Sequence, residues 1–173
     1  MGMLEGKVAF ITGGARGQGR AHAITCAREG ADVVIVDVVS DVVETTYGLA
    51  TADDHAETVK LVREYGRRVI DVEADVRDQD ALDAAVGRAV DELGHIDIVI
   101  ANAGIHAFAP FWELTEEQWD AMIGINLTGA WKTIKADTAL YLNSDLAANV
   151  TGQNISVDNG HLLLPGSNPT GTG

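Results

Sequence analysis

The chain has 173 residues, of which 26 are acidic and 12 basic, so its formal net charge is −14. Hydrophobic residues make up 46% of the chain, which is enough for one globular core and excludes a disordered protein. The strong acidity argues against a nucleic-acid partner, because the phosphates would be repelled.

The sequence also shows no signal for a membrane helix, for secretion or for a metal site. The longest apolar runs, at 33–36 and 96–101, are far shorter than the roughly 18 residues that a membrane helix needs. Residues 1–7 contain no apolar leader segment. Cys26 is the one cysteine, so an intramolecular disulfide is excluded and a cysteine-based metal cluster has no ligands. We therefore expect a cytoplasmic protein without a membrane partner or a metal site.

Strand-like and helix-like segments alternate through the first two thirds of the chain. Four short runs rich in β-branched residues predict strands, and their continuous apolar character indicates burial on both faces of a parallel sheet. Capping residues and glycine stops mark helices in the gaps. The predicted strands are 7–12, 32–37, 69–73 and 96–101, and the predicted helices are 20–28, 52–65, one from 78 to 94 and one that begins at Thr115.

This order predicts an α/β fold, with a Rossmann-type, doubly wound parallel sheet in three layers and right-handed crossovers. We assign residues 1–160 to a single domain. Residues 161–173 are rich in Gly, Pro, Ser and Thr, and this composition predicts a flexible C-terminal tail.

A glycine-rich turn, TGGARGQG at 12–19, joins the first predicted strand to the first helix. Such glycines allow a pyrophosphate to approach closely, and the helix N-terminus then offers N–H groups and a positive dipole. The second strand ends in Asp37, which is either a solvated strand end or a carboxylate that binds an adenosine ribose and repels a 2′-phosphate. Arg16 is an opposing signal, since a basic residue could meet that phosphate. We give Asp37 more weight, and the pattern then favours NAD over NADP.

Three motifs in order resemble the short-chain dehydrogenase/reductase family over residues 1–136. The glycine turn is similar to the family's cofactor motif, Asp75 stands where the family places an aspartate against the adenine, and Asn102-Ala103-Gly104 matches its Asn-Ala-Gly motif. The resemblance implies NAD as cofactor, a small-molecule alcohol or ketone as substrate, and a homotetramer. The cofactor-binding residues that it implies are Gly13, Arg16, Gly17, Gln18, Gly19, Asp37, Val38, Asp75, Val76, Asn102, Ala103 and Gly104.

Asn126 is the one amide on an otherwise apolar helical stripe that runs from Trp119 to Ile134. A buried amide without a partner costs about 1–3 kcal/mol, so something should satisfy it. One interpretation is a structural bond to a neighbouring backbone. The other follows the resemblance, because the family's asparagine in an Asn-x-x-Gly setting holds a water that relays protons to the catalytic lysine. Asn126 is then the one catalytic residue that the sequence offers. The tryptophans of this region are predicted to lie in the core or at a subunit interface.

Residues 38–51 form a long connection, whereas most βα loops have roughly 2–6 residues. A loop of this length at the carboxyl end of a strand is either a surface decoration or a cover for the cofactor. Together with the GARGQG turn, it resembles the carveol dehydrogenase group, the mycofactocin-associated short-chain dehydrogenases, in which the insertion is thought to cover NAD. That resemblance implies a tightly held NAD and a redox partner that re-oxidises NADH.

The family's catalytic Ser and Tyr-x-x-x-Lys pair are missing, because none of the three tyrosines is followed by a lysine four residues later. Residues 137–160 resemble the family's last helix and strand, so two strands and their crossovers, roughly 60–100 residues, are absent near 136–138. The fourth strand should then be an exposed apolar edge.

Three explanations stay open for this gap: residues omitted from the sequence, an internal deletion, or a non-catalytic remnant. We predict an NAD-dependent oxidoreductase that interconverts a secondary alcohol, carveol-like or steroid-like, and a ketone. The alternative is an inactive nucleotide-binding remnant.

Overall fold

Four parallel strands form the sheet of the computed structural model, which describes residues 2–42, 45 and 47–142. The spatial order is β3-β2-β1-β4, so the chain starts in the middle of the sheet and winds outward in both directions. Val8 pairs with Asp32 on one side, and Ala9 pairs with Ile98 on the other. The strands are β1 (Val8–Thr12), β2 (Asp32–Asp37), β3 (Val69–Glu73) and β4 (Ile98–Ala101).

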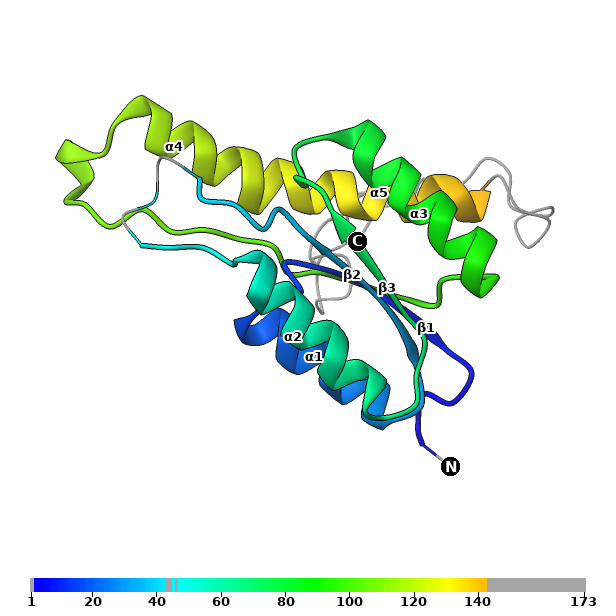
Figure 1. Cartoon of the computed structure of the whole chain (residues 1–173). Coiled ribbons are helices and arrows are strands. Elements are labelled where there is room, and N and C mark those ends of the chain that lie inside the picture. Colours follow the sequence, from blue (N-terminus) through cyan, green and yellow to red (C-terminus); the bar gives the residue numbers. More distant parts are fainter. Residues whose placement is uncertain (1, 43–44, 46, 143–173) are drawn as a thin grey trace, which may run out of the picture.

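Helices cover both faces of this sheet, as Figure 1 shows: α1 and α2 lie on one face, and α3 and α5 lie on the other. The predicted three-layer, doubly wound α/β architecture is therefore confirmed for the described residues. The helices are α1 (Gly17–Arg28), α2 (Ala52–Arg63), α3 (Gln79–Leu93), α4 (Glu116–Met122) and α5 (Ala130–Leu142), with a short 3-10 turn η1 (Phe111–Glu113) and a π-helical segment η2 (Ile123–Gly129).

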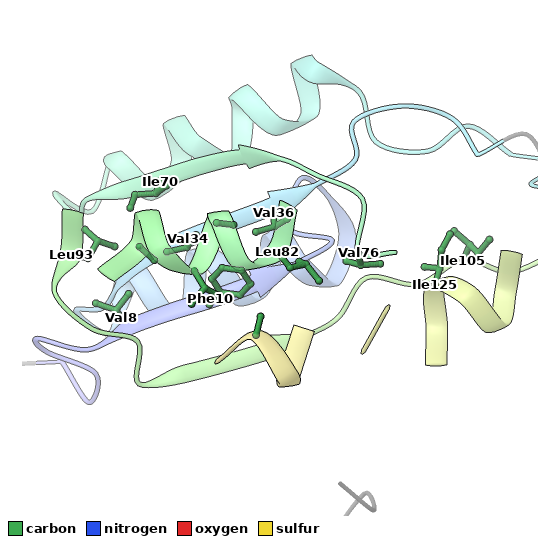
Figure 2. Close-up of a cluster of buried hydrophobic side chains, with 14 of the residues drawn as sticks. Val8, Phe10, Val34, Val36, Ile70, Val76, Leu82, Leu93, Ile105 and Ile125 are labelled. Carbon is green, nitrogen blue, oxygen red and sulfur yellow. The ribbon is translucent and has the colours of Figure 1, made fainter. Parts of the chain in front are cut away.

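Alternation along β1 divides the core into two clusters. Val8 and Phe10 point to the α3 face, where they pack with Leu82 (Figure 2). Ala9 and Ile11 point to the opposite face and join the cluster that α1 and α2 cover. Because both faces are covered, every residue of β1 is buried, as the continuous apolar run predicts.

Local signals set most helix starts. Thr51 and Asp54 form the predicted capping box at the start of α2, and Thr115 and Gln118 form the one at α4. Helix α1 starts at Gly17, three residues earlier than predicted, because the last glycines of the turn form its first turn. Strand β4 starts at Ile98, two residues later than predicted.

Most of the stripe from Trp119 to Ile134 stays outside the core, although Met122 packs against one core cluster. Trp119 is 51% exposed and Leu127 is 64% exposed, so a core position is wrong for them. The buried face of the same helical stretch carries small and medium residues instead, and small residues let α5 approach α3 and β4 closely. Residues of this buried face are Ala121, Ile125, Gly129, Thr133 and Ala136.

Helix α5 continues without interruption through 136–138, and its last described residue is Leu142. The segment that resembles the family's last strand and the predicted tail at 161–173 lie outside the described residues. Omission of residues near 136–138 and the 1–160 domain boundary stay predictions. No helix among the described residues is long and apolar enough to cross a membrane.

Candidate cofactor site

A cavity of about 390 Å³ opens at the carboxyl ends of β1, β2 and β4. This is the point where the strand order reverses, since β1 is followed by β2 on one side and is flanked by β4 on the other. Almost the whole predicted cofactor set meets here. The residues from that set that line the cavity are Gly13, Arg16, Gly17, Gln18, Asp37, Val38, Asp75, Val76, Asn102, Ala103 and Gly104.

The glycines of the turn are required by space and by backbone conformation. Gly13 has φ +66°, and a Cβ there would lie 2.7 Å from the Cα of Ala103. A Cβ on Gly19 would lie 2.0 Å from the carbonyl oxygen of Gly13, so Gly19 supports the turn from behind and does not line the cavity. Gly17 has φ +58° with open space around it. The turn therefore leaves a hollow of the kind that a phosphate group needs.

The N-terminus of α1 borders the same hollow. Arg16 is its N-cap residue, and no side chain caps this helix end. The side chains of Thr51, Asp78 and Thr115 cap α2, α3 and α4 in the ordinary way. First-turn N–H groups without a side-chain cap, at the positive end of a helix dipole, suit an anionic ligand.

Asp37 lies at the end of β2 and faces the turn. Its Oδ2 accepts a hydrogen bond from the backbone N–H of Ala15 at 2.9 Å, which fixes the carboxylate against the glycine turn. Two residues later, Val39 has φ +45° and is the one non-glycine residue in this conformation among those described. A β-branched residue in this conformation stores about 1–3 kcal/mol of strain at the turn that follows Asp37.

Asn102 joins the two halves of the sheet. Its Nδ2 donates to the carbonyl oxygens of Thr12 and Gly13, at 3.0 and 3.1 Å. The hydroxyl of Thr12 accepts in return from the backbone N–H groups of Asn102 and Ala103. This pattern locks the end of β4 to the glycine turn.

Asp75 lines the cavity but is engaged by Arg77. The Arg77 guanidinium contacts both carboxylate oxygens, at 2.6–3.1 Å, and the Arg77 N–H donates at 2.8 Å. Burial disfavours the charged form, but these hydrogen bonds and the positive charge outweigh it and hold the pKa of Asp75 below its ordinary value. The carboxylate is therefore ionised at neutral pH.

The long connection after β2 forms one wall of the cavity. Tyr47, Leu49 and Ala50 line it, and a guanidinium nitrogen of Arg16 donates to the carbonyl oxygen of Gly48 at 2.7 Å. Sequence reasoning identified the length of this connection but not these lining residues, because loop side chains show no periodic pattern from which their direction follows.

Asn126 corrects a premise of the sequence analysis. It is exposed rather than buried, and it lies in the middle of the π-helical segment η2. Its Oδ1 accepts from the N–H of Ile105 at 2.8 Å, and its Nδ2 donates to the carbonyl oxygen of Ile105 at 2.9 Å. These are the structural backbone bonds of the first interpretation. A catalytic role for Asn126 remains a prediction.

Among the described residues, no cluster of His, Cys, Asp or Glu could hold a metal ion.

Known protein families and relatives match most of this chain. The model of the short chain dehydrogenase family matches residues 7–157. The chain belongs to this family. Among curated relatives, (−)-trans-carveol dehydrogenase of Rhodococcus erythropolis is 55% identical over 137 residues, which cover 78% of this chain and 49% of the relative. An uncharacterized NAD-dependent oxidoreductase of Mycobacterium tuberculosis is 42% identical over 167 residues, covering 92% and 61%.

Solved structures agree with the family assignment. The carveol dehydrogenase from Mycobacterium avium in complex with NAD has a TM-score of 0.78 and 44% identity to this chain, over 80% of this chain and 50% of the other. A short chain dehydrogenase from Mycobacterium paratuberculosis bound to NAD has the same TM-score and 45% identity, over 80% and 51%. The short-chain dehydrogenase therefore spans about half to three fifths of the length of these relatives.

Proposed function

We propose that this short-chain dehydrogenase binds NAD in the cavity at the carboxyl edge of its sheet. The observation that carries the proposal is the hollow at Gly13 and Gly17 beside the N-terminus of α1, with Asp37 at its rim. A dinucleotide needs such a phosphate cradle and a carboxylate at the end of the second strand. Two solved relatives were crystallised with NAD, which supports the proposal.

Each part of the cavity would hold a different part of the cofactor. Gly13, Gly17 and Gln18 with the first turn of α1 would hold the pyrophosphate, while Gly19 keeps the turn tight. Asp37 and Val38 would bind the adenosine ribose. Asp75 and Val76 would flank the adenine, and Asn102, Ala103 and Gly104 would support the nicotinamide end. NAD itself supplies the hydride chemistry when bound.

Preference for NAD over NADP follows from two charged side chains. The Asp37 carboxylate would repel a 2′-phosphate, as like charges at close range do. Arg16 is the cation that the sequence offers to such a phosphate, but it donates to the carbonyl oxygen of Gly48 instead. Both observations favour the cofactor without the additional phosphate.

We further propose that the whole protein is an NAD-dependent oxidoreductase that interconverts a secondary alcohol, such as a carveol-like or steroid-like ring alcohol, and a ketone. The family and the named relatives support this activity. Retention of NAD under the connection 38–51, with re-oxidation by a redox partner, belongs to the same proposal. So does a homotetramer, in which the exposed Trp119 and Leu127 would be covered.

A second candidate function is nucleotide binding without redox chemistry. The observation in its favour is that no tyrosine in the 173 residues is followed four positions later by a lysine. Incubating the purified protein with NAD and (−)-trans-carveol, and following NADH by absorbance, separates the two functions. Formation of NADH supports the oxidoreductase, whereas NAD binding without turnover supports the second candidate. An intact mass above 18.3 kDa would show that further residues are present.

A further inference from the structure

Two neighbouring residues of the long connection contact opposite sides of the cavity. The Tyr47 hydroxyl accepts a hydrogen bond from the backbone N–H of His106 at 2.8 Å, in the loop that follows β4. The Gly48 carbonyl accepts from Arg16, the N-cap of α1, at 2.7 Å. We name this pair the Tyr47–Gly48 bridge. It connects the glycine turn to the loop after β4 without passing through the sheet.

Aromatic packing holds the Tyr47 ring in place for this contact. Tyr47 meets Phe108 edge to face, with ring centroids 6.1 Å apart and an angle of 68° between the rings. Phe108 in turn lies 4.3 Å from the His106 ring. The Tyr47 ring thus has an aromatic contact on one side while its hydroxyl meets the His106 N–H, as tyrosines with an apolar body and a polar end commonly do.

The loop after β4 has a second attachment on its other side. Asn126 binds both backbone polar groups of Ile105, so residue 105 is fixed by η2 and residue 106 is fixed by the bridge. Ile105 and Tyr47 both line the cavity. Of these two attachments, the one through Tyr47 is the one that also leads, through Gly48 and Arg16, to the phosphate end of the cavity.

We propose that Tyr47 is a positioning residue that couples cofactor binding to the loop at 105–108. The inference rests on the proposed NAD binding and extends it. With a dinucleotide between Arg16 and Gly104, the bridge holds the two walls of the cavity together. Loss of the Tyr47 hydroxyl therefore speeds release of the cofactor, and it uncouples residues 105–108 from cofactor binding.

Packing alone is the competing role for Tyr47, and a conservative variant separates the two. Tyr47→Phe keeps the ring and its contact with Phe108 but removes the hydroxyl acceptor. Tyr65→Phe is the matched control, because Tyr65 is 46% exposed, follows α2 and does not line the cavity. A role in packing alone predicts the same cofactor release in all three proteins.

The experiment uses the full chain and NADH as the probe. Release of bound NADH into an excess of NAD is followed by fluorescence until it is complete, and we expect it to be about threefold to tenfold faster for Tyr47→Phe, the effect of one neutral hydrogen bond. Amide hydrogen exchange provides the second readout. NADH should slow exchange over residues 105–108 in the wild type and in Tyr65→Phe, and much less in Tyr47→Phe.

The outcomes distinguish this inference from the function on which it rests. A wild type that does not bind NADH overturns the proposed function, and the inference with it. A wild type that binds NADH, with Tyr47→Phe showing the wild-type release rate and the same protection at 105–108, overturns the inference alone. Faster release with lost protection supports both.

Discussion

The two flanks of β1 are built differently. On the β2 side, every residue from Val33 to Val36 is buried, both faces are covered, and the strand leads directly into the cofactor cavity. On the β4 side, all four residues of the strand are half-buried, and the helical stretch beyond it exposes Trp119, Leu127 and Trp131. Within the described residues, the β2 flank is therefore well covered, whereas the β4 flank carries exposed apolar side chains. The cavity lies between these two flanks and takes lining residues from both, for example Asp37 at the end of β2 and Asn102 after β4.

Truncating one isoleucine on each flank tests this difference most strongly. Ile35→Ala should lower the free energy of unfolding by about 2–5 kcal/mol, because its side chain is fully buried in β2. Ile100→Ala in half-exposed β4 should cost only about 1 kcal/mol, since less apolar area is lost. Urea denaturation of the two variants measures both values. Equal losses would mean that the β4 flank is as well covered as the β2 flank.

A methyl group on the glycine turn should give the next largest effect. In Gly19→Ala, the new Cβ would lie 2.0 Å from the Gly13 carbonyl oxygen, so the turn must shift. We expect this shift to lower the free energy of unfolding by about 1–3 kcal/mol and to abolish NAD binding. Gly87→Ala, at an exposed position of α3, is the control. It meets nothing within 4 Å and should stabilise the helix by about 0.5–1 kcal/mol. Thermal unfolding and an NAD titration check both variants. A Gly19→Ala variant that keeps the wild-type melting temperature and still binds NAD would contradict the tight-turn geometry.

Asp97 lies at the amino ends of β1 and β4, opposite the cavity, and offers a pH-dependent test. Its carboxylate accepts from the Lys7 ammonium at 2.8 Å and the Val8 N–H at 2.9 Å, so it ties the start of β1 to the start of β4. Desolvation opposes the charge, but these hydrogen bonds and the neighbouring positive charges prevail, and the pKa of Asp97 lies below its ordinary value. A lowered native pKa stabilises the fold above the unfolded pKa, near 3.8, and this stability is lost as the pH falls through the native pKa.

Asp97→Asn should therefore cost about 1 kcal/mol at neutral pH, and the difference from the wild type should shrink as the pH falls below about 4. Urea denaturation at a series of pH values provides the comparison. A difference between the two proteins that does not change with pH would show that the ionised carboxylate is not the stabilising group.

The smallest effect on stability is expected on the exposed helical face. Leu127→Lys should change the free energy of unfolding by no more than about 0.5 kcal/mol, because the side chain is 64% exposed. It should nevertheless reduce the mass of the assembly in solution if this face joins subunits. Light scattering after gel filtration reads that mass. An unchanged assembly would remove Leu127 from the proposed subunit contact.

Sequence patterns predicted the features that depend on local chemistry. The glycine turn, the carboxylate at the end of β2 and the two capping boxes need particular residue types at fixed spacing, so Gly13, Asp37, Thr51 and Thr115 could be placed without coordinates. A periodic stripe, in contrast, does not say which of its neighbouring helix faces is buried. The faces of α4 and α5 were therefore assigned wrongly, and the supposed burial of Asn126 with them.

Contacts between loops could not be predicted at all. The hydrogen bond from His106 to Tyr47 joins residues 59 positions apart in two segments without periodicity. Its existence depends on where β2 and β4 end in space, which follows from the order of the strands rather than from either loop. The same is true of the Arg16 contact with Gly48, which turned a sequence signal for NADP into support for NAD.

Calorimetric titration of the purified chain, freed of any bound cofactor, with NAD and with NADP is the most direct test of the proposed NAD site. We predict saturable binding of NAD and an affinity for NADP at least about tenfold weaker, with Asp37→Ala narrowing that difference as the repelling carboxylate is removed. Absence of NAD binding, or equal affinity for the two cofactors in the wild type, would contradict it.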